Sequence, residues 1–186
     1  MSGFDLTETQ RQLQEQGDGI PPLERWNPEF CGDIDMRIAR DGTWFYCGTP
    51  IGRKAMVRMF SRVLWLEDGA YFLKTPVEKV GIKVDDLPFQ IVNLDVRDGA
   101  QGPELHFTSA TDDHIVAGPA HPIEVAEDPV SGEPAPALKV RFGMYGRIHR
   151  NLFYQLVDMA RAEPADGGGE ELVVYSCGER FSLGKL

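Results

Sequence analysis

The chain has few cysteines and no long apolar run. Its three cysteines, Cys31, Cys47 and Cys177, form no C-x-x-C pair and are odd in number, which argues against a disulfide framework and leaves at least one thiol free. No stretch approaches the roughly 18 consecutive apolar residues of a membrane-spanning helix, and residues 1–19 are polar where a signal peptide would be apolar. We therefore expect a soluble cytoplasmic protein with no membrane partner.

Common catalytic and metal-binding motifs are also missing. The sequence has no G-x-S-x-G nucleophile elbow, no G-x-x-x-x-G-K-S/T phosphate loop and no dinucleotide-binding G-x-G-x-x-G. Its four histidines show no zinc-ligand spacing, and Asp33 with Asp35 alone supplies too few oxygen ligands for a dedicated cation site. A salt bridge to Arg37 or Arg53 is the expected role of this aspartate pair. The sequence thus predicts no metal, no cofactor and no recognisable enzyme.

Positive charge is scarce overall but clustered. The 19 Lys and Arg residues against 29 Asp and Glu give a net charge of −10, which disfavours nucleic acid as a partner because its phosphates attract many cations. The windows 50–62 and 139–150 contain no carboxylate. Such clusters in an acidic chain predict a site for a small anion or an acidic peptide. The cations of the two windows are Arg53, Lys54, Arg58, Arg62, Lys139, Arg141, Arg147 and Arg150.

Apolar periodicity and turn signals divide the chain into three parts. Residues 1–20 are predicted to be flexible, or to form at most a frayed helix capped by Thr7. Residues 21–88 and 89–186 are predicted to be two α+β halves, each an antiparallel sheet packed with one amphipathic helix. The segment Asp85–Pro88 is the expected seam between them.

In the first half we expect a hairpin over 33–46 with a turn at Asp41-Gly42, a helix capped by Thr49 and running from Pro50 to Leu66, and strands over 70–74 and 77–84. In the second half we expect strands near 89–96, 105–108, 114–116, 123–125 and 137–141, a helix over 145–161 and a closing hairpin over 172–183. Placing residues 51–53 over 145–147 aligns the two helices. This alignment suggests an internal duplication, although any two amphipathic helices would match in this way.

Several motifs together resemble the DUF1285 family of uncharacterised bacterial proteins. They are Trp26-Asn27-Pro28, Cys31–Ile38, Asp41–Tyr46, Thr49–Arg53 and Thr75–Ile82. The resemblance covers roughly residues 22–161 and implies a duplicated α+β architecture whose C-terminal half superficially resembles a pleckstrin-homology fold. It also implies a small-ligand site between the halves, with nucleotides as one ligand class, and a role in signal transduction. Arg150 matches the family pattern, whereas Arg147 stands where that pattern is apolar.

The candidate ligand-binding residues combine cations with aromatic rings that could stack on a base. Cations near the first turn of a helix are disfavoured by about 0.3–1 kcal/mol unless an anion occupies the exposed N–H groups. The ordinary alternatives stay open, namely core packing of the rings and neutralisation of the cations by Asp33, Asp35, Asp85, Asp86 or Glu78. The candidate set is Arg37, Trp44, Tyr46, Arg53, Lys54, Arg58, Lys79 and Arg150.

Three functions are compatible with this sequence. The favoured one is a sensing module that binds an anionic, for example nucleotide-like, small molecule between its halves and passes the occupancy to a signalling protein partner. The second is a protein-interaction adaptor, in which a flat basic face docks an acidic peptide. The third is an enzyme of unrecognised type, which would need paired titratable groups such as Asp35 and His149 in one cleft.

Overall fold

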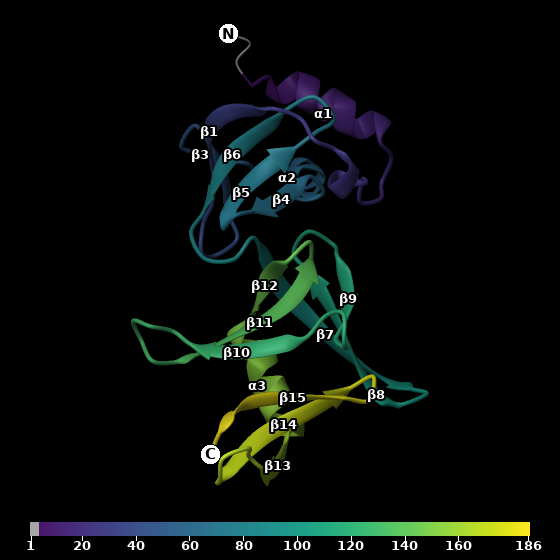
Figure 1. The fold of residues 1–186 in the computed structure, drawn as a ribbon, viewed down its shortest axis with the longest axis vertical. Coiled ribbons are helices and arrows are strands. Elements are labelled where there is room, and N and C mark those ends of the chain that lie inside the picture. The colour runs from purple at the N-terminus through teal and green to yellow at the C-terminus, as the bar shows by residue number, and fades with distance from the viewer. Residues whose placement is uncertain (1–3) are drawn as a thin grey trace. The chain divides into compact units, whose positions relative to one another are not determined.

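The computed structural model describes residues 4–186 and divides into two compact units, Met1–Pro88 and Phe89–Leu186. Each unit has its own six-stranded sheet and its own buried core (Figure 1). We describe each unit by itself.

The N-terminal unit consists of one sheet and two α-helices. Its helices are α1 (Leu6–Glu15) and α2 (Lys54–Ser61), and a short 3-10 turn covers Leu23–Arg25. The order of strands across the sheet is β3-β2-β1-β6-β5-β4. The strands are β1 (Phe30–Ile38), β2 (Trp44–Tyr46), β3 (Thr49–Pro50), β4 (Leu64–Glu67), β5 (Ala70–Lys74) and β6 (Lys79–Val84).

The C-terminal unit has a second six-stranded sheet, one helix and a small third sheet. The large sheet has the order β10-β11-β12-β7-β8-β9, and the small one is the meander β13-β14-β15. The helix α3 (Arg150–Met159) connects β12 to β13. The strands are β7 (Phe89–Gly99), β8 (Gly102–Ser109), β9 (His114–Val116), β10 (Ile123–Glu127), β11 (Pro134–Arg141), β12 (Met144–Ile148), β13 (Arg161–Pro164), β14 (Glu170–Ser176) and β15 (Glu179–Lys185).

The prediction of two similar α+β halves is confirmed. Numbered within its own unit, each large sheet has the strand order 3-2-1-6-5-4. The sheets are mixed rather than antiparallel, however, because β1 pairs with β6 and β12 pairs with β7 in parallel. The helices also differ in place: α2 lies between the third and fourth strands of its sheet, whereas α3 follows the sixth strand. The predicted likeness of the C-terminal half to a pleckstrin-homology fold stays a prediction.

Four two-residue turns that end in glycine shape both units. In each, a non-glycine residue and the glycine after it both have positive φ, which is the backbone of a type I′ hairpin turn. They join β2 to β3, β4 to β5, β11 to β12 and β14 to β15. The turns are Cys47-Gly48, Asp68-Gly69, Phe142-Gly143 and Cys177-Gly178.

The first predicted helix is wrong at both ends. Thr49 and Pro50 pair with Tyr46 and Phe45 as β3, so α2 begins only at Lys54. At the other end, Leu64 already belongs to β4. The helix is therefore eight residues long rather than about four turns, because Leu64 is buried as the first residue of β4.

The second predicted helix begins too early. Residues 144–148 form β12, which pairs with β11 through Gly146 and Arg147, and α3 starts at Arg150. The alignment of residues 51–53 with 145–147 is therefore wrong, because it places the loop before α2 over strand β12.

The predicted hairpin around Asp41-Gly42 is confirmed by the pairing of β1 with β2.

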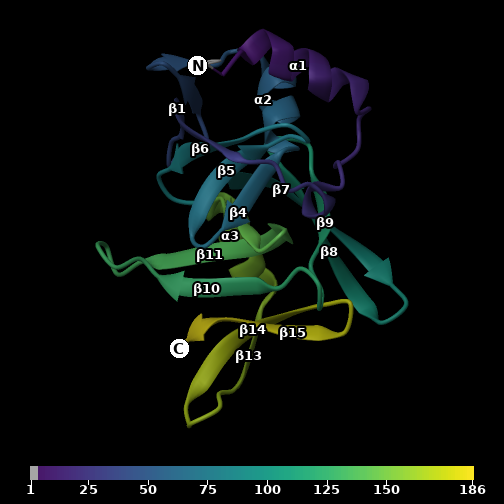
Figure 2. The same ribbon diagram turned by 45° about the horizontal axis from the view of Figure 1, so that its top comes forward.

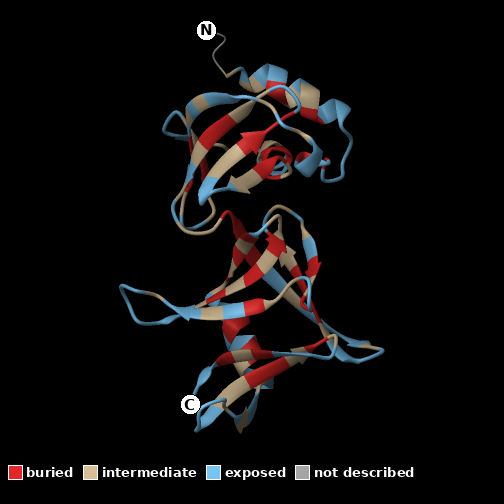
Figure 3. Cartoon of the chain, viewed as in Figure 1, coloured by how far each residue is buried: buried red, intermediate tan, exposed pale blue. Residues whose placement is uncertain are grey.

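Within residues 1–20, predicted to be flexible or to form a frayed helix, the structure has a helix. The structure places α1 here, and Asp5 rather than Thr7 caps it by accepting hydrogen bonds from the N–H groups of Thr7 and Glu8 at 2.9 and 3.3 Å. Leu13 is 2% exposed, so α1 has an apolar anchor despite its polar sequence. Buried residues otherwise lie mainly on α2, α3 and the sheet strands (Figure 3).

Candidate functional site

A groove between α1 and α2 is lined by three arginines of the first basic window. The two helices are neighbours in both ribbon views (Figures 1 and 2), and the groove has a volume of about 380 Å³. All of its lining residues belong to the N-terminal unit. Its cations are Arg53, Arg58 and Arg62, its other polar residues Gln10, Gln14 and Asp18, and its apolar residues Ala55, Met56 and Met59, with Gly17 completing the lining.

The helix α2 positions the three guanidinium groups. Arg53 is its N-cap, Arg58 lies on its second turn, and Arg62 is its C-cap. Arg62 points back across the groove, where its Nε donates to the carbonyl oxygen of Gly19 at 2.8 Å and its Nη2 donates to the carbonyl of Gly17. Arg62 therefore ties the loop that follows α1 to the end of α2.

The groove carries an excess of positive charge. Three guanidinium groups and one carboxylate, that of Asp18, line it in a protein whose net charge is −10. The first turn of α2 contains no acidic residue, and no side chain caps the helix. Within residues 4–186, Arg53 forms no ion pair. The positive end of the helix dipole therefore adds to the field of the arginines rather than being offset by a carboxylate.

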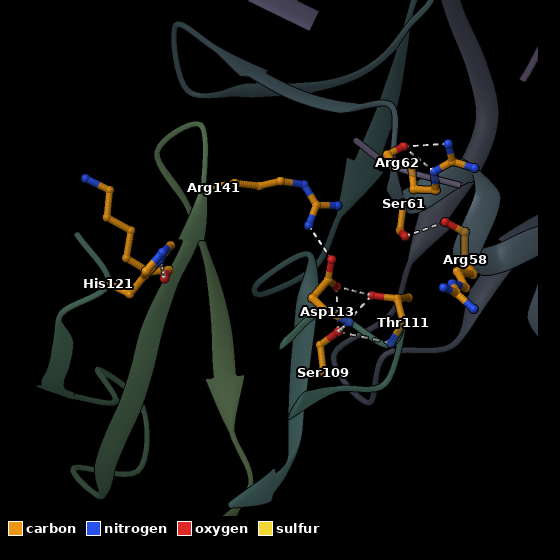
Figure 4. Close-up of polar contacts among 10 residues, drawn as sticks. Arg58, Ser61, Arg62, Ser109, Thr111, Asp113, His121 and Arg141 are labelled. Carbon is orange, nitrogen blue, oxygen red and sulfur yellow. Dashed lines mark hydrogen bonds and ion pairs between the residues drawn. The ribbon is translucent and has the colours of Figure 1, made fainter. Parts of the chain in front are cut away.

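The structure brings only part of the predicted set into this groove. Arg53 and Arg58 line it, whereas Lys54 is exposed on α2 outside the lining. Ser61 donates to the main-chain carbonyl of Arg58 at 2.6 Å, which fixes the last turn of the helix (Figure 4).

Two other predicted cations are paired inside the sheet. Arg37 on β1 forms an ion pair with Asp85 at 2.5 Å and lies over the Phe45 ring at 4.7 Å. Lys79 on β6 forms an ion pair with Glu67 at 2.5 Å, with its side chain 18% exposed. The charge of Arg37 is therefore neutralised by Asp85, one of the acidic partners named in the sequence analysis. The aspartates of β1 are not its partner.

The aromatic residues of the predicted set belong to the packing of the unit. Trp44 is 2% exposed and stacks on Phe60, with ring centroids 6.5 Å apart. It therefore offers no free face to a base. Tyr46 is half-buried, packs edge-on against Phe4 at 6.4 Å, and burial raises its pKa.

The second basic window is dispersed over three elements of the C-terminal unit. Arg150 on α3 forms an exposed ion pair with Glu133, and Arg147 on β12 donates to the carbonyl of Pro136 at 3.2 Å. Arg141 on β11 forms a buried ion pair with Asp113 at 2.5 Å (Figure 4). Each of these arginines thus has a partner within its own unit, and the predicted role of Arg150 as a ligand contact stays a prediction.

Sequence reasoning missed the residues that α1 contributes. Gln10, Gln14 and Asp18 come from a segment expected to be flexible. A helix in this segment could have been predicted from the spacing of Leu6 and Leu13, which are seven residues apart and therefore lie on the same helical face. Asp5 before that pair is a further helix-start signal.

Neither a metal site nor a membrane span is visible in residues 4–186. No three His, Cys, Asp or Glu side chains in this part of the chain are grouped to hold an ion. Within the same residues, no helix combines the length and apolar character that crossing a bilayer requires.

Comparison with known proteins covers both units. The protein-family model "Domain of unknown function (DUF1285), N-terminal domain" matches residues 21–87. A second family model, "Protein of unknown function (DUF1285), C-terminal domain", matches residues 88–183. No functionally curated protein matches the chain.

Two crystal structures are similar to this one. A DUF1285 family protein from Silicibacter pomeroyi DSS-3 is 45% identical, with a TM-score of 0.90 over 100% of this chain and 97% of that one. A DUF1285 family protein from Shewanella baltica OS155 is 25% identical, with a TM-score of 0.54 over 67% of this chain and 91% of that one. The resemblance seen in the sequence motifs is therefore confirmed, and the chain belongs to the DUF1285 family.

Proposed function

We propose that this protein is a cytoplasmic ligand-sensing module whose N-terminal unit binds an anionic small molecule in the groove between α1 and α2. The observation that carries the proposal is the convergence of Arg53, Arg58 and Arg62 on one groove with a single carboxylate. Guanidinium groups donate paired hydrogen bonds to phosphate and carboxylate oxygens, and each such charge-assisted bond is about twice as strong as a neutral one.

The other lining residues favour a ligand with both a phosphate and an organic part. Gln10 and Gln14 supply amide groups that can both donate and accept, and Met56 and Met59 supply flexible apolar surface. The volume of about 380 Å³ falls within the usual range for small-molecule sites. A nucleotide combines these features, since its phosphate would contact the arginines and its base would contact the glutamines and methionines.

The shape of the site favours a small molecule over an acidic peptide. A peptide-docking adaptor would present its cations on one continuous flat face, whereas here the cations face a hollow and Lys54 lies outside it. We propose that occupancy is passed to a signalling partner through α1, because α1 forms one wall of the groove and Arg62 ties the loop that follows α1 to the end of α2. The expectation that the ligand lies between the two halves stays a prediction.

Thermal unfolding tests the proposal. The protein would be heated with AMP, ATP, cyclic AMP, glucose 6-phosphate or succinate, at low and at physiological salt. A ligand at about 100 times its Kd stabilises the folded state by about 2.7 kcal/mol, and each kcal/mol raises the Tm of a chain of this size by roughly 2–4 °C. We expect a salt-sensitive rise of several degrees with at least one of the phosphorylated compounds.

Two charge reversals of equal size locate the site. Arg53→Glu should abolish the rise, because it places a carboxylate in the groove. Lys54→Glu is the matched control, since it makes the same change on the next residue outside the lining. Equal loss in both variants would favour the flat-face adaptor, and no rise with any compound in the wild type would refute the proposal.

A further inference from the structure

We propose that the C-terminal unit holds a second, separate ligand site: an apolar groove that takes an aliphatic carboxylate, with its chain in the groove and its head group on Arg161. This site is independent of the anion site proposed above, because no residue is common to the two. Its volume is about 330 Å³.

Four parts of the C-terminal unit line the groove. One wall is the β7–β8 hairpin, the other is β14, and the end of α3 and the first residue of β13 also line the space. The N–H of Leu105 on β8 donates to the Oγ of Ser176 at 2.9 Å, and the N–H of Cys177 donates to the carbonyl of Pro103 at 3.0 Å. The two walls are therefore bonded directly to each other, and the groove needs no closing motion to form.

The lining is mostly aliphatic and partly exposed to solvent. Val96 is 47% exposed and Met159 is 40% exposed, and both side chains line the groove. The thioether chain of Met159 can adapt to ligands of different shape. The apolar lining residues are Val96, Pro103, Leu105, Met159, Val173 and Val174.

One cation and no carboxylate line the groove. Arg161, the exposed first residue of β13, is that cation, and within residues 4–186 it forms no ion pair. The next carboxylate on the same face of β13, Glu163, is already held by the Tyr175 hydroxyl at 2.9 Å and by the Nε of Arg180 at 3.1 Å. An apolar hollow beside a single unpaired guanidinium fits a ligand with one apolar chain and one negative group.

The polar groups of the lining argue against a peptide as the occupant. A peptide laid in an apolar groove buries N–H and C=O groups, and each one that lacks a partner carries a free-energy cost. Apart from Arg161, the polar side chains of the lining are Gln101 and Tyr175, and the hydroxyl of Tyr175 is engaged by Glu163. An aliphatic chain has no such groups to satisfy, so it fits this lining better.

Calorimetric titration of the full-length protein tests the proposal. Decanoate, kept below its micelle concentration at pH 8, is compared with decanol, which has the same chain without the charge, and with acetate, which has the charge without the chain. We expect the wild type to bind decanoate more tightly than decanol and not to bind acetate. An undetectable heat with decanoate would overturn the proposal.

Variants separate the two parts of the site. Arg161→Gln should weaken decanoate binding about tenfold, the scale of one hydrogen bond to a charged group, and leave decanol binding unchanged. Arg97→Gln removes one exposed positive charge from β7 outside the lining and should change neither affinity. Val96→Glu should block both ligands, because it places a carboxylate on the apolar wall.

Three outcomes would contradict the assignment. The head group would not lie at Arg161 if Arg161→Gln bound decanoate as tightly as the wild type. If Arg161→Gln lost binding of both decanoate and decanol, Arg161 would maintain the shape of the groove rather than contact the head group. A short apolar peptide with a free terminal carboxylate that bound more tightly than decanoate would identify a peptide site instead.

Discussion

Asp113 is the residue on which the polar contacts of the C-terminal unit converge. Its carboxylate accepts hydrogen bonds from Ser109 Oγ at 2.5 Å, from Thr111 Oγ1 at 2.6 Å and from Arg141 Nη1 at 2.5 Å (Figure 4). The side chains of Asp113 and Arg141 are 14% and 13% exposed. A buried charge pair with this many additional donors is costly to break from one side, because the partner charge stays buried.

We predict that Asp113→Asn destabilises the protein by about 3–5 kcal/mol, the usual cost of removing one partner of a buried ion pair. The control is Asp95→Asn, which breaks the exposed pair with Arg97 and should cost about 1 kcal/mol or less. Urea unfolding measures both. Similar losses in the two variants would show that the Asp113 cluster contributes no more than a surface pair.

Lys74 is the residue from which a pH dependence is expected. It is 6% exposed, its Nζ lies 3.9 Å from the Trp65 ring centroid, and burial lowers its pKa. In the pH range between the lowered folded pKa and the ordinary unfolded value of about 10.4, the unfolded chain binds more protons than the folded one. The contribution of Lys74 to the free energy of unfolding should therefore rise with pH in that range.

This prediction is checked by urea unfolding of the wild type and of Lys74→Met from about pH 8 to pH 10.4. The difference in stability between the two proteins should shift in favour of the wild type as pH rises. Burial raises the pKa of Tyr71, which acts in the opposite direction, but Tyr71 is present in both proteins and cancels in the comparison. A pH-independent difference would contradict the account of Lys74.

At the scale of elements, the hairpin turns that end in glycine determined which strands and helices could be predicted from the sequence. Asp41-Gly42 was recognised as a hairpin turn because aspartate followed by glycine is a strong turn signal. Cys47-Gly48 and Phe142-Gly143 were missed because cysteine and phenylalanine seldom adopt positive φ. The wrong start of each predicted helix follows from these two turns, because β3 after the first and β12 after the second were assigned to helices.

The turn at Cys47 gives an element-scale prediction. Positive φ costs an ordinary L-residue roughly 1–2 kcal/mol, whereas asparagine adopts it routinely. Because Cys47 is exposed and its φ is 49°, Cys47→Asn should stabilise the protein by up to about 1 kcal/mol. Cys47→Val should destabilise it, since a β-branched residue fits positive φ worst. Urea midpoints of the two variants should move in opposite directions, and a shared direction would refute this reading of the turn.

The parallel strand pairs could not be predicted for a different reason. Turn residues specify only the pairing of strands that follow one another, whereas β1 and β6 are separated in the chain by all the other strands of the sheet.

The candidate site likewise could be predicted only where its residues are close in sequence. Arg53 and Arg58 were found because they share one short window, while Gln10 and Gln14 reach the groove only through the packing of α1 on α2.

At the scale of the whole molecule, each unit has its own sheet and its own core, as independently folding domains do. We predict that residues 1–88 expressed alone fold cooperatively. All three tryptophans of the chain lie in this unit, and Trp44 is buried, so tryptophan fluorescence should be blue-shifted and should change in a single urea transition. Emission typical of exposed tryptophan without urea would contradict this prediction.

The central claim is that an anion binds between α1 and α2, and amide NMR spectra of the full-length protein titrated with AMP test it most directly. The account predicts that the largest shifts fall on the side-chain amides of Gln10 and Gln14 and on the backbone amides of residues 53–58, and that Arg53→Glu abolishes them while Lys54→Glu does not. Shifts confined to other parts of the chain, or identical titrations in the two variants, would contradict it.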